Sequence, residues 1–291
     1  MTDVDIIIVN HNTKDLLRQC IKSVYANTPK NSFEIIVIDN SSVDESLQMI
    51  KREFPDVKVI ENKENLGFSK ANNQGITAGR GRYVLLLNSD TLVLPSTLDI
   101  MKQFLHDHPD VGIVGSRTFY SDYTVQATAR SFPTPINALF GRKSILTRLF
   151  PTNRFSRRYL TCFNQDYSEP FEVDWVAGSC LMVKRKMIDE IGLLDEGFWM
   201  YWEDADWCYR AKKKGWKVFC VPEAKIIHYE GMSSKKQSAK LIMEFHKSIY
   251  RYYRKHHVGS YVNPVNILAL VGLACRAGII LVVNFIKKSV K

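Results

Sequence analysis

The sequence lacks the cysteine pattern of a disulfide framework or of a zinc site. Its 291 residues include six cysteines, and no two of them form a C-x-x-C pair. Scattered cysteines of this kind indicate reduced core residues, which is their usual state in the cytosol. The N-terminal stretch MTDVDIIIVN has no basic segment followed by a long apolar one, so it predicts an early strand rather than a signal peptide.

A glycine-rich phosphate loop is also missing. Neither G-x-G-x-x-G nor the P-loop pattern follows the first predicted strand, Asp5–Val9. This absence argues against dinucleotide enzymes and phosphate-loop NTPases. A related fold that binds phosphates would need another counter-charge, and a divalent metal ion is the natural one.

Acidic residues are fewer than basic ones. The chain has 40 Lys and Arg against 30 Asp and Glu, which is a net charge of +10. This excess suggests an anionic partner, such as nucleic acid, anionic lipid or a phosphorylated substrate, without distinguishing among them. Hydrophobic residues make up 45% of the chain, which excludes wholesale disorder and allows a large core.

Apolar runs typical of buried strands alternate with helical patterns along the first 90 residues. The predicted strands are 5–9, 34–38, 57–60 and 83–87, and the predicted helices are 14–26, 44–53 and 68–78. Such alternation indicates βαβ units and therefore an α/β fold with a mostly parallel sheet flanked by helices.

Polar side chains follow three of these strands. The first strand ends in VNHN, the second in IDNSS and the fourth in LNSD, which contains Asp90. Asn, Ser and Asp are common in turns, so one such ending would need no further explanation. Three endings at the same edge of a parallel sheet favour a ligand site there, because open α/β sheets bind ligands beyond the carboxyl ends of their strands.

The stretch MYWEDADWCYR, residues 200–210, combines three acids with aromatic residues. One or two acids at the start of a helix are explained by capping and by the helix dipole. Three acids between aromatic side chains suggest more, because apolar surroundings raise the pKa of a carboxylate and suit it to act as a general base. A helix is predicted over 204–214, followed by the strand WKVFCV and an extended segment over 224–228.

Taken together, the motifs resemble those of inverting family 2 glycosyltransferases of the GT-A fold, in the branch similar to rhamnosyltransferases. They occur in the family's order over about residues 5–231: IIIVNHNTKDLL, IIVIDNSSVDES, NLGFSKANNQGI, YVLLLNSDT, DWVAGSCLMVKR, GLLDEGFWMYWEDADWCYR and IIHYEG. The resemblance implies a nucleotide-binding half (1–120) and an acceptor half (121–231) with a basic insertion at 130–170. A helical C-terminal extension would follow over 232–291.

The resemblance also implies residues that bind the nucleotide. Asn10, Asn12 and Asp39 would line the nucleoside pocket, and Asp39 would bond the base or the ribose. Asn72 falls where many relatives contact the nucleotide. Asn88 stands at the first position of the family's D-x-D motif, where an Asp is usual, and is expected to lie at the nucleotide as well.

The same resemblance implies a metal site and a catalytic pair. Asp90 would hold Mg²⁺ or Mn²⁺, and His228 would be a further ligand, although a structural histidine at a strand end is the alternative. In the family's E-D motif, Asp204 would be the general base, and Glu203 would position it or bind acceptor hydroxyls. A further group would shape the pocket for the donor and acceptor sugars: Trp175, Gly178 and Trp202.

The implied reaction transfers a sugar, with inversion, from a nucleotide diphosphate sugar. The branch suggests dTDP-rhamnose as donor, and a lipid-linked (polyprenyl diphosphate) or polysaccharide acceptor in bacterial cell-surface polysaccharide synthesis. The enzyme would act at the cytoplasmic face of the cell membrane as a peripheral or monotopic protein. It could also form a homo-oligomer.

Two regions bear on membrane binding. Residues 141–160, GRKSILTRLFPTNRFSRRYL, interleave basic and apolar residues, and they fit either a solvated loop or a surface for anionic lipid phosphates. The tail, residues 262–288, is long and apolar, but Arg276 near its middle argues against a span. Its polar residues gather on one side, which favours a helix lying in the interface; packing on the domain or in an oligomer is the alternative.

Other functions fit the sequence less well. A sugar nucleotidyltransferase should have a glycine-rich basic loop after the first strand, and VNHNTKD is neither. A nucleic-acid binder would interleave basic and aromatic residues, whereas here the most aromatic segment is acidic. A non-catalytic scaffold remains open because of Asn88, although Glu203 and Asp204 argue for an enzyme.

Overall fold

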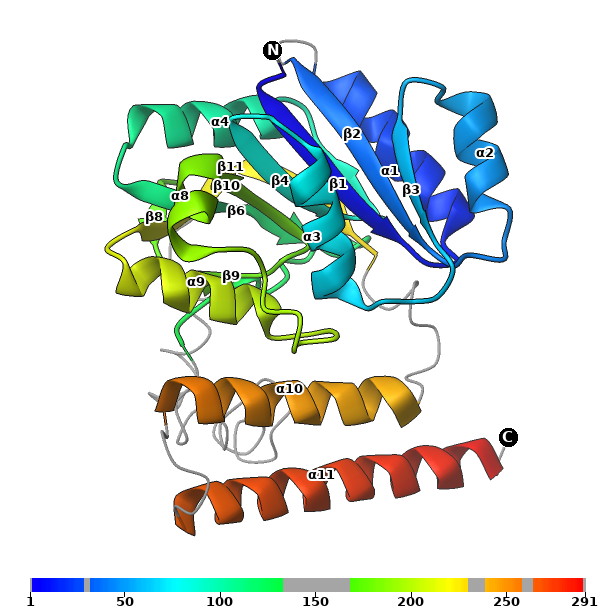
Figure 1. Ribbon diagram of the computed structural model, residues 1–291, viewed down its shortest axis with the longest axis vertical. Coiled ribbons are helices and arrows are strands. Elements are labelled where there is room, and N and C mark those ends of the chain that lie inside the picture. Colours follow the sequence, from blue (N-terminus) through cyan, green and yellow to red (C-terminus); the bar gives the residue numbers. More distant parts are fainter. Residues whose placement is uncertain (1, 29–31, 133–167, 230–238, 258–263, 290–291) are drawn as a thin grey trace.

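The computed structural model describes residues 2–28, 32–132, 168–229, 239–257 and 264–289. Within these ranges a nine-stranded sheet forms the centre of the molecule, in the order β3-β2-β1-β4-β10-β6-β11-β5 with β8 paired to β11 (Figure 1). Six strands run in one direction, and β5, β8 and β10 run in the other, so the prediction of a mostly parallel sheet is confirmed. The strands of this sheet are β1 (Val4–Asn10), β2 (Phe33–Asn40), β3 (Lys58–Asn62), β4 (Tyr83–Asn88), β5 (Thr91–Val93), β6 (Val111–Phe119), β8 (Phe171–Glu172), β10 (Cys180–Lys184) and β11 (Lys217–His228).

Helices cover both faces of the sheet. One face packs against α1 (Lys14–Asn27), α2 (Ser46–Glu53) and α4 (Thr97–Asp107), and the other against α3 (Phe68–Ala78), α8 (Arg185–Ile191) and α9 (Glu203–Lys213). Along β1, Ile7 joins the core under α3 and α9, while Ile6 and Ile8 join the core under α1 and α4. Burial on both faces explains why this strand is continuously hydrophobic rather than alternating.

Two predicted elements differ in extent from the observed ones. Helix α2 begins at Ser46 instead of Asp44, because Glu45 adopts a left-handed conformation (φ 64°) and the Asp44 carboxylate accepts hydrogen bonds from the backbone N–H groups of Lys14 and Ser46. The two segments predicted around Pro222 form one strand, β11. A register shift between Val221 and Lys225 absorbs the irregularity and brings the end of β11 beside β5.

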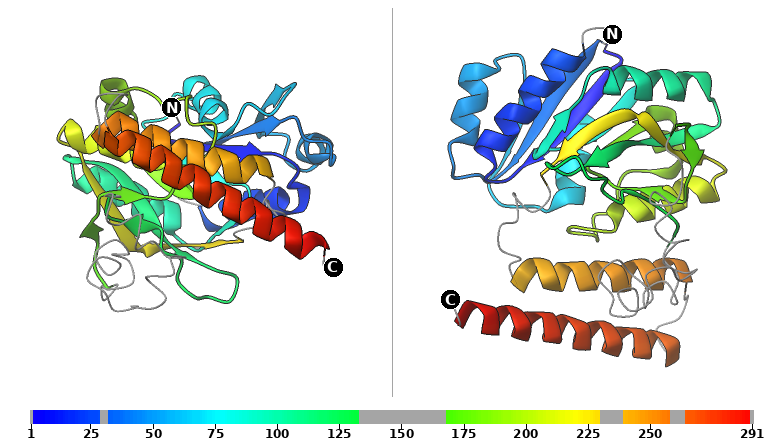
Figure 2. Two further views of the ribbon diagram at one scale, coloured as in Figure 1. Left: turned by 90° about the horizontal axis from the view of Figure 1, so that it is seen from below. Right: turned by 180° about the vertical axis from the view of Figure 1, so that it is seen from behind.

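A C-terminal pair of helices stacks below the α/β domain. Helix α10 (Ala239–His257) lies between the domain and α11 (Pro264–Ser289) in Figure 1 and in the right view of Figure 2. The carboxyl ends of β1 and β2 point toward this side of the molecule. None of the helices in the described ranges combines the length and hydrophobicity that a bilayer crossing requires. The basic stretch 141–160 lies outside the described residues.

Candidate active site

Three strand ends meet at one edge of the sheet. In the parallel pairing of β1 with β2, Asn10 lies opposite Asp39, and in the pairing of β1 with β4, Asn88 lies opposite Val9. Asn10 Nδ2 donates to Asp39 Oδ1 at 2.8 Å, and the Ser42 N–H donates to Asp39 Oδ2 at 2.9 Å. We call Asn10, Asp39 and Ser42 the strand-end cluster. Asp39 is fully buried, and both of its carboxylate oxygens accept hydrogen bonds within this cluster.

Asn12 ties the loop after β1 to the loop after β2. It has a φ of 56°, in the left-handed region that Asn tolerates better than most residues, and its Oδ1 accepts the Val43 N–H at 2.7 Å. Asn72 lies elsewhere, on α3, where it is buried and its amide donates to the Phe68 carbonyl at 2.9 Å. A role in nucleotide binding stays a prediction for both residues.

Asn88, Asp90 and His228 come together beyond the ends of β4 and β11, and we call them the metal set. Asp90 Oδ1 lies 3.1 Å from His228 Nε2, and Asn88 Nδ2 lies 3.5 Å from the same nitrogen. Asn88 Oδ1 is buried and has no hydrogen-bond partner among the described residues. A buried carbonyl oxygen, a carboxylate and an imidazole are suitable ligands for a divalent cation, so the residues fit such an ion.

Gln126 determines which ring nitrogen of His228 carries a proton. The Gln126 amide donates from Nε2 to the His228 carbonyl at 2.8 Å, so its Oε1 must face the ring, where it lies 3.1 Å from Nδ1. An oxygen in that place accepts a hydrogen, which leaves the proton on Nδ1. In the neutral ring the lone pair of Nε2 would then be left for a cation held between this nitrogen and Asp90 Oδ1, as in a metal-binding histidine.

A second acidic group lies at the N-terminus of α9. Tyr201 and Trp202 precede it with positive φ values of 69° and 70°, which turn the chain sharply into the helix. Glu203 is 5% exposed, and its Oε2 is buried without a hydrogen-bond partner among the described residues. Asp204 Oδ2 accepts the Gly178 N–H at 2.9 Å. We call Glu203 and Asp204 the carboxylate pair.

The surroundings raise the pKa values of both carboxylates of this pair. Burial, together with the negative charge of Asp204, raises the pKa of Glu203 well above its ordinary value. Burial also raises the pKa of Asp204, against the N–H donors of Gly178 and Ala205 and the positive charge of Arg130, which lower it. A raised carboxylate pKa brings a group closer to the range in which it serves as a general base.

The third acid of the motif, Asp206, is an ion-pair residue. It is fully buried and accepts hydrogen bonds from Arg210, and from Lys255 and His256 of α10, at 2.7 to 2.8 Å. Burial alone would raise the pKa of Asp206, but these partners lower it to about 2. Its carboxylate therefore anchors α10 and is not available for proton transfer near neutral pH.

Aromatic and small residues line the approach to Asp204. The short strands β7 (Ala129–Arg130) and β9 (Trp175–Val176) pair with Arg130 opposite Trp175, and the Arg130 guanidinium lies 5.0 Å from the centre of the indole. The rings of Trp175 and Trp202 stack at 6.1 Å. A Cβ atom at Gly178 would lie within 3.8 Å of Asp204 and Phe68, so the structure brings Trp175, Gly178 and Trp202 together around the base.

Two residues that contact the site, Gln126 and Arg130, were not predicted from the sequence. Both lie in TVQATAR, a segment without acidic clusters or glycine patterns. Only the contact with His228 identifies Gln126, and only the packing on Trp175 and the effect on Asp204 identify Arg130. Neither residue could have been identified from composition, because single Gln and Arg residues are common in any sequence.

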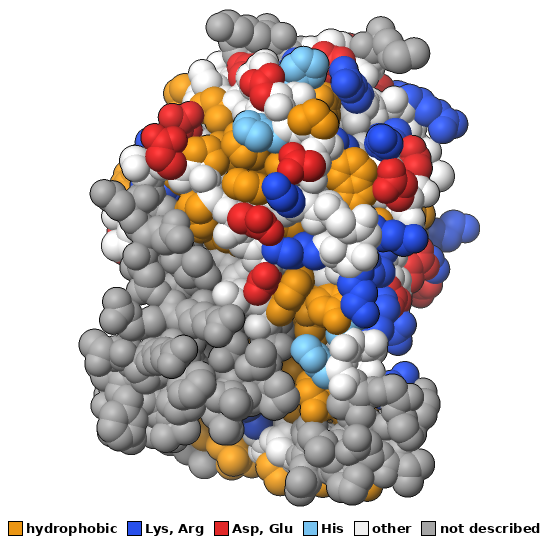
Figure 3. Space-filling view, turned by 90° about the vertical axis from the view of Figure 1, so that its left-hand side faces the viewer, with side chains coloured by type: hydrophobic (Ala, Val, Ile, Leu, Met, Phe, Trp, Pro, Cys, Tyr) orange, Lys and Arg blue, Asp and Glu red, His pale blue; other side chains and the backbone are white. Residues whose placement is uncertain are grey.

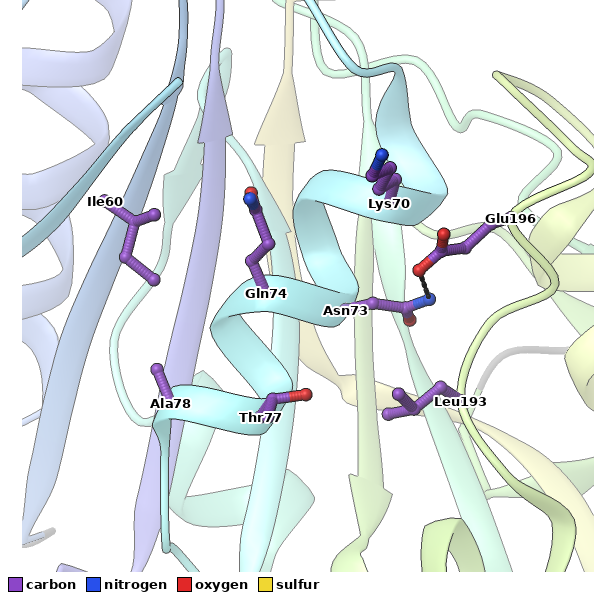
Figure 4. A pocket seen from close by; sticks show the side chains of 8 residues that line it. All are labelled: Ile60, Lys70, Asn73, Gln74, Thr77, Ala78, Leu193 and Glu196. Atoms are coloured by element: carbon purple, nitrogen blue, oxygen red, sulfur yellow. Dashed lines mark hydrogen bonds between the residues drawn. The ribbon is translucent and has the colours of Figure 1, made fainter. Parts of the chain in front are cut away.

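Two surface hollows lie away from these groups. The first, with a volume of ≈ 450 Å³, follows the outer side of α3 between Ile60 and Leu193, and it includes the contact of Asn73 with Glu196 (Figure 4). The second, of ≈ 370 Å³, is basic and lies between α8, α9 and the end of α10. Neither is lined by a predicted site residue.

Comparison with known proteins bears on the family and the fold of the chain. The chain is 28% identical to an N-acetylglucosaminyl-diphospho-decaprenol L-rhamnosyltransferase of Mycobacterium tuberculosis, over 95% of this chain and 92% of the relative. Its fold is similar to that of a mannosyltransferase from Pyrobaculum calidifontis in complex with GDP-Man and Mn²⁺ (TM-score 0.57, 16% identity, 97% of this chain and 81% of the other). It is also similar to GalNAc-T7 with UDP, GalNAc and Mn²⁺ (TM-score 0.61, 17% identity, 96% and 55%). The profile of glycosyl transferase family 2 matches residues 5–192, and the chain belongs to that family.

Proposed function

We propose that this glycosyltransferase is an inverting enzyme that transfers a sugar from a nucleotide diphosphate sugar to an acceptor hydroxyl. The proposal rests on one observation, which is that the metal set and the carboxylate pair adjoin. The Asn88 N–H donates to the Ser179 carbonyl at 3.0 Å, while the N–H of the preceding residue, Gly178, donates to Asp204. A leaving group held at the metal set would thus lie beside a base at α9.

The carboxylate pair supplies the proton chemistry. Asp204 takes the proton from the acceptor hydroxyl while the hydroxyl oxygen forms a bond to the anomeric carbon. The bond from that carbon to the diphosphate oxygen breaks in the same displacement, which inverts the configuration. A Mg²⁺ or Mn²⁺ ion, held by Asn88, Asp90 and His228, would neutralise charge on the diphosphate.

The donor and acceptor are proposed from the similarity of the whole chain to one relative. That relative is named for rhamnosyl transfer to N-acetylglucosaminyl-diphospho-decaprenol, and the alignment covers 95% of this chain. We therefore propose dTDP-rhamnose as donor and a polyprenyl-diphosphate-linked sugar as acceptor, with a polysaccharide as the alternative. Asn10, Asn12, Asp39 and Asn72 are proposed to contribute to the nucleotide site, and Trp175, Gly178 and Trp202 to the sugar pocket.

Helix α11 supports a site at a membrane surface. Its Ala277 is buried, whereas Ile279, Val282 and Phe285 are 64%, 58% and 72% exposed. This separation gives the helix an exposed apolar face, and the helix lies on the side of the molecule toward which β1 and β2 point (Figure 1). Figure 3 shows many Lys and Arg side chains toward the right of the face, interspersed with Asp and Glu. The last turn of α10 is basic, so an anionic leaflet is the proposed partner. We place this membrane at the cytoplasmic side, where nucleotide sugars are made.

The test is a transfer assay with a defined set of donors. Purified protein would be offered UDP-, GDP- and dTDP-sugars with Mg²⁺, Mn²⁺ or EDTA and a membrane lipid extract. We expect metal-dependent consumption of one donor that is lost in Asp204→Asn and Asp90→Ala, with Asp99→Asn of α4 as a matched control. The absence of turnover and of nucleotide binding by calorimetry would contradict the proposal and favour a non-catalytic scaffold.

A further inference from the structure

The backbone just before the carboxylate pair is held in an unusual conformation. Tyr201 and Trp202 are consecutive non-glycine residues with positive φ values, and Trp202 is the N-cap of α9. Such a conformation persists only where the surroundings hold it. The placement of Glu203 and Asp204 therefore depends on whatever packs against these two residues.

Helix α10 supplies that packing, although it lies outside the 5–192 range that the family profile matches. Ser248 Oγ donates to the Met200 carbonyl at 2.8 Å, and Ser248 is 3% exposed. The Phe245 ring lies 5.5 Å from Tyr201 and 6.4 Å from Trp202. The Tyr252 ring lies 5.4 Å from Trp202. The helix thus contacts all three residues that lead into the carboxylate pair.

Ion pairs fasten α10 on both sides of this segment. Before it, Asp195 binds Arg251 at 2.9 Å and Lys255 at 2.7 Å. After it, Asp206 binds Lys255 and His256, each at 2.7 Å. Because Lys255 bridges the two carboxylates, the chain between them is closed into a loop against the helix.

We propose that α10 is a positioning element for the carboxylate pair. Phe245 is a positioning residue that acts through Tyr201 and Trp202, and Ser248 is one that acts through Met200. The proposal rests on the proposed glycosyl transfer for its kinetic consequences. The structural part of the proposal, which states that contacts with α10 hold residues 200–206, does not depend on that function. The strand-end cluster and the metal set belong to other elements and carry the proposed contacts with the nucleotide and its diphosphate. The donor Kd should therefore depend little on α10, even though Trp202 is proposed to line the sugar pocket.

The test compares Phe245→Ala and Ser248→Ala with Met243→Ala. Met243 lies on the same helix but is 42% exposed, so it serves as the matched control. Each variant would be assayed for kcat and KM with the donor that the wild type consumes, and for donor Kd by calorimetry in the presence of Mn²⁺. Amide hydrogen exchange would be followed in residues 200–206 and in β1 and β2.

We expect kcat to fall at least tenfold in Phe245→Ala, because small displacements of a catalytic group cost up to about 10² in rate. Donor Kd should stay within twofold, exchange should accelerate over 200–206 but not in β1 and β2, and Met243→Ala should match the wild type. Ser248→Ala should show the same pattern more weakly, and it decides the matter if Phe245→Ala fails to fold.

An unchanged kcat despite faster exchange over 200–206 would overturn the positioning role, and so would unchanged exchange in both variants. A parallel loss of donor affinity and of kcat would also overturn it, because it would indicate a general structural effect. If the wild type consumes no donor, the proposed function fails, and the exchange experiment still decides whether α10 holds the segment.

Discussion

The strand-end cluster and the N-terminus of α9 are both buried and polar, but they are built differently. At the strand ends, both oxygens of Asp39 accept hydrogen bonds from neighbouring groups. At α9, Glu203 Oε2 is buried without such a partner among the described residues, and two positive φ angles precede it. A satisfied polar group stabilises a fold, whereas an unsatisfied one lowers stability and is retained where it does chemistry. This difference supports the proposal that α9 is the reactive side.

The strongest test of this comparison is Asp204→Asn. The variant keeps an oxygen that can accept the Gly178 N–H but cannot take a proton, so transfer should fall by about 10² to 10⁴. Its stability to urea should stay close to that of the wild type. A variant that retained full activity would contradict the assignment of the base.

Asp206→Asn should instead reduce stability, by about 3 kcal/mol, because it removes a buried charge from Arg210, Lys255 and His256. The pKa of Asp206 is depressed to about 2 in the folded state, from an ordinary 3.8. Its contribution is therefore present above about pH 4 and is lost as the pH falls toward 2. Urea unfolding at pH 7 and pH 3 should show the difference from the wild type shrinking in acid. Asp110→Asn, which breaks a solvent-exposed pair with Lys217, is the control and should leave the stability close to that of the wild type.

Asp39→Ala should destabilise the strand-end cluster by about 1 to 3 kcal/mol, because it leaves the Ser42 N–H without its acceptor and Asn10 without one of its two. Urea unfolding measures this loss. Nucleotide affinity, measured by calorimetry, should also fall if the proposed nucleotide site is correct. An unchanged stability would show that the cluster is not the satisfied scaffold described above.

Gln126→Ala would test the metal set. Loss of the Gln126 Oε1 contact frees the His228 ring to change tautomer, so Mn²⁺ affinity should weaken by about 10- to 100-fold. Calorimetric titration with Mn²⁺ alone measures the effect without any turnover. Gln103→Ala on α4, whose amide bonds only Asp107 at the surface, is the matched control and should bind Mn²⁺ as the wild type does.

The smallest effect is expected for Glu203→Gln. Because the folded protein holds the Glu203 proton more tightly than the unfolded chain, its stability declines as the pH rises above about 4.5 through the folded pKa. Replacing the carboxyl by a neutral amide should remove this decline and add about 1 kcal/mol at pH 8, with little change at pH 4. A variant that is less stable at pH 8 would show that Glu203 is bonded in the folded state.

Most of the fold could be predicted from local patterns. Continuous β-branched runs indicated β1 and β2, and helical spacing of apolar residues indicated α1 and α3; the predicted range 68–78 coincides with α3. The predicted start of α2 was too early because Glu45 turns left-handed to let Asp44 bond the N–H of Lys14, the first residue of α1. Such a contact has no local signature.

The candidate site could be predicted in part. Polar strand endings indicated that Asn10, Asp39 and Asn88 share an edge, and the register confirms this arrangement. The sequence motif gave no reason to distinguish Glu203, Asp204 and Asp206, although Asp206 forms an ion pair with α10. Separating the acids required knowledge of what packs against each one, and α10 lies about fifty residues further along the chain.

The sequence by itself determined the α/β class, the edge of the sheet that carries polar groups and the acidic motif at α9, because these depend on periodicity and on neighbours in the chain. Only the tertiary structure decided that Gln126 orients His228, that Arg130 lies on Trp175, and that α10 packs on Tyr201 and Trp202. The reason is physical. The protonation and the backbone conformation of a residue depend on the groups within a few ångströms of it, and folding brings those groups from distant parts of the chain.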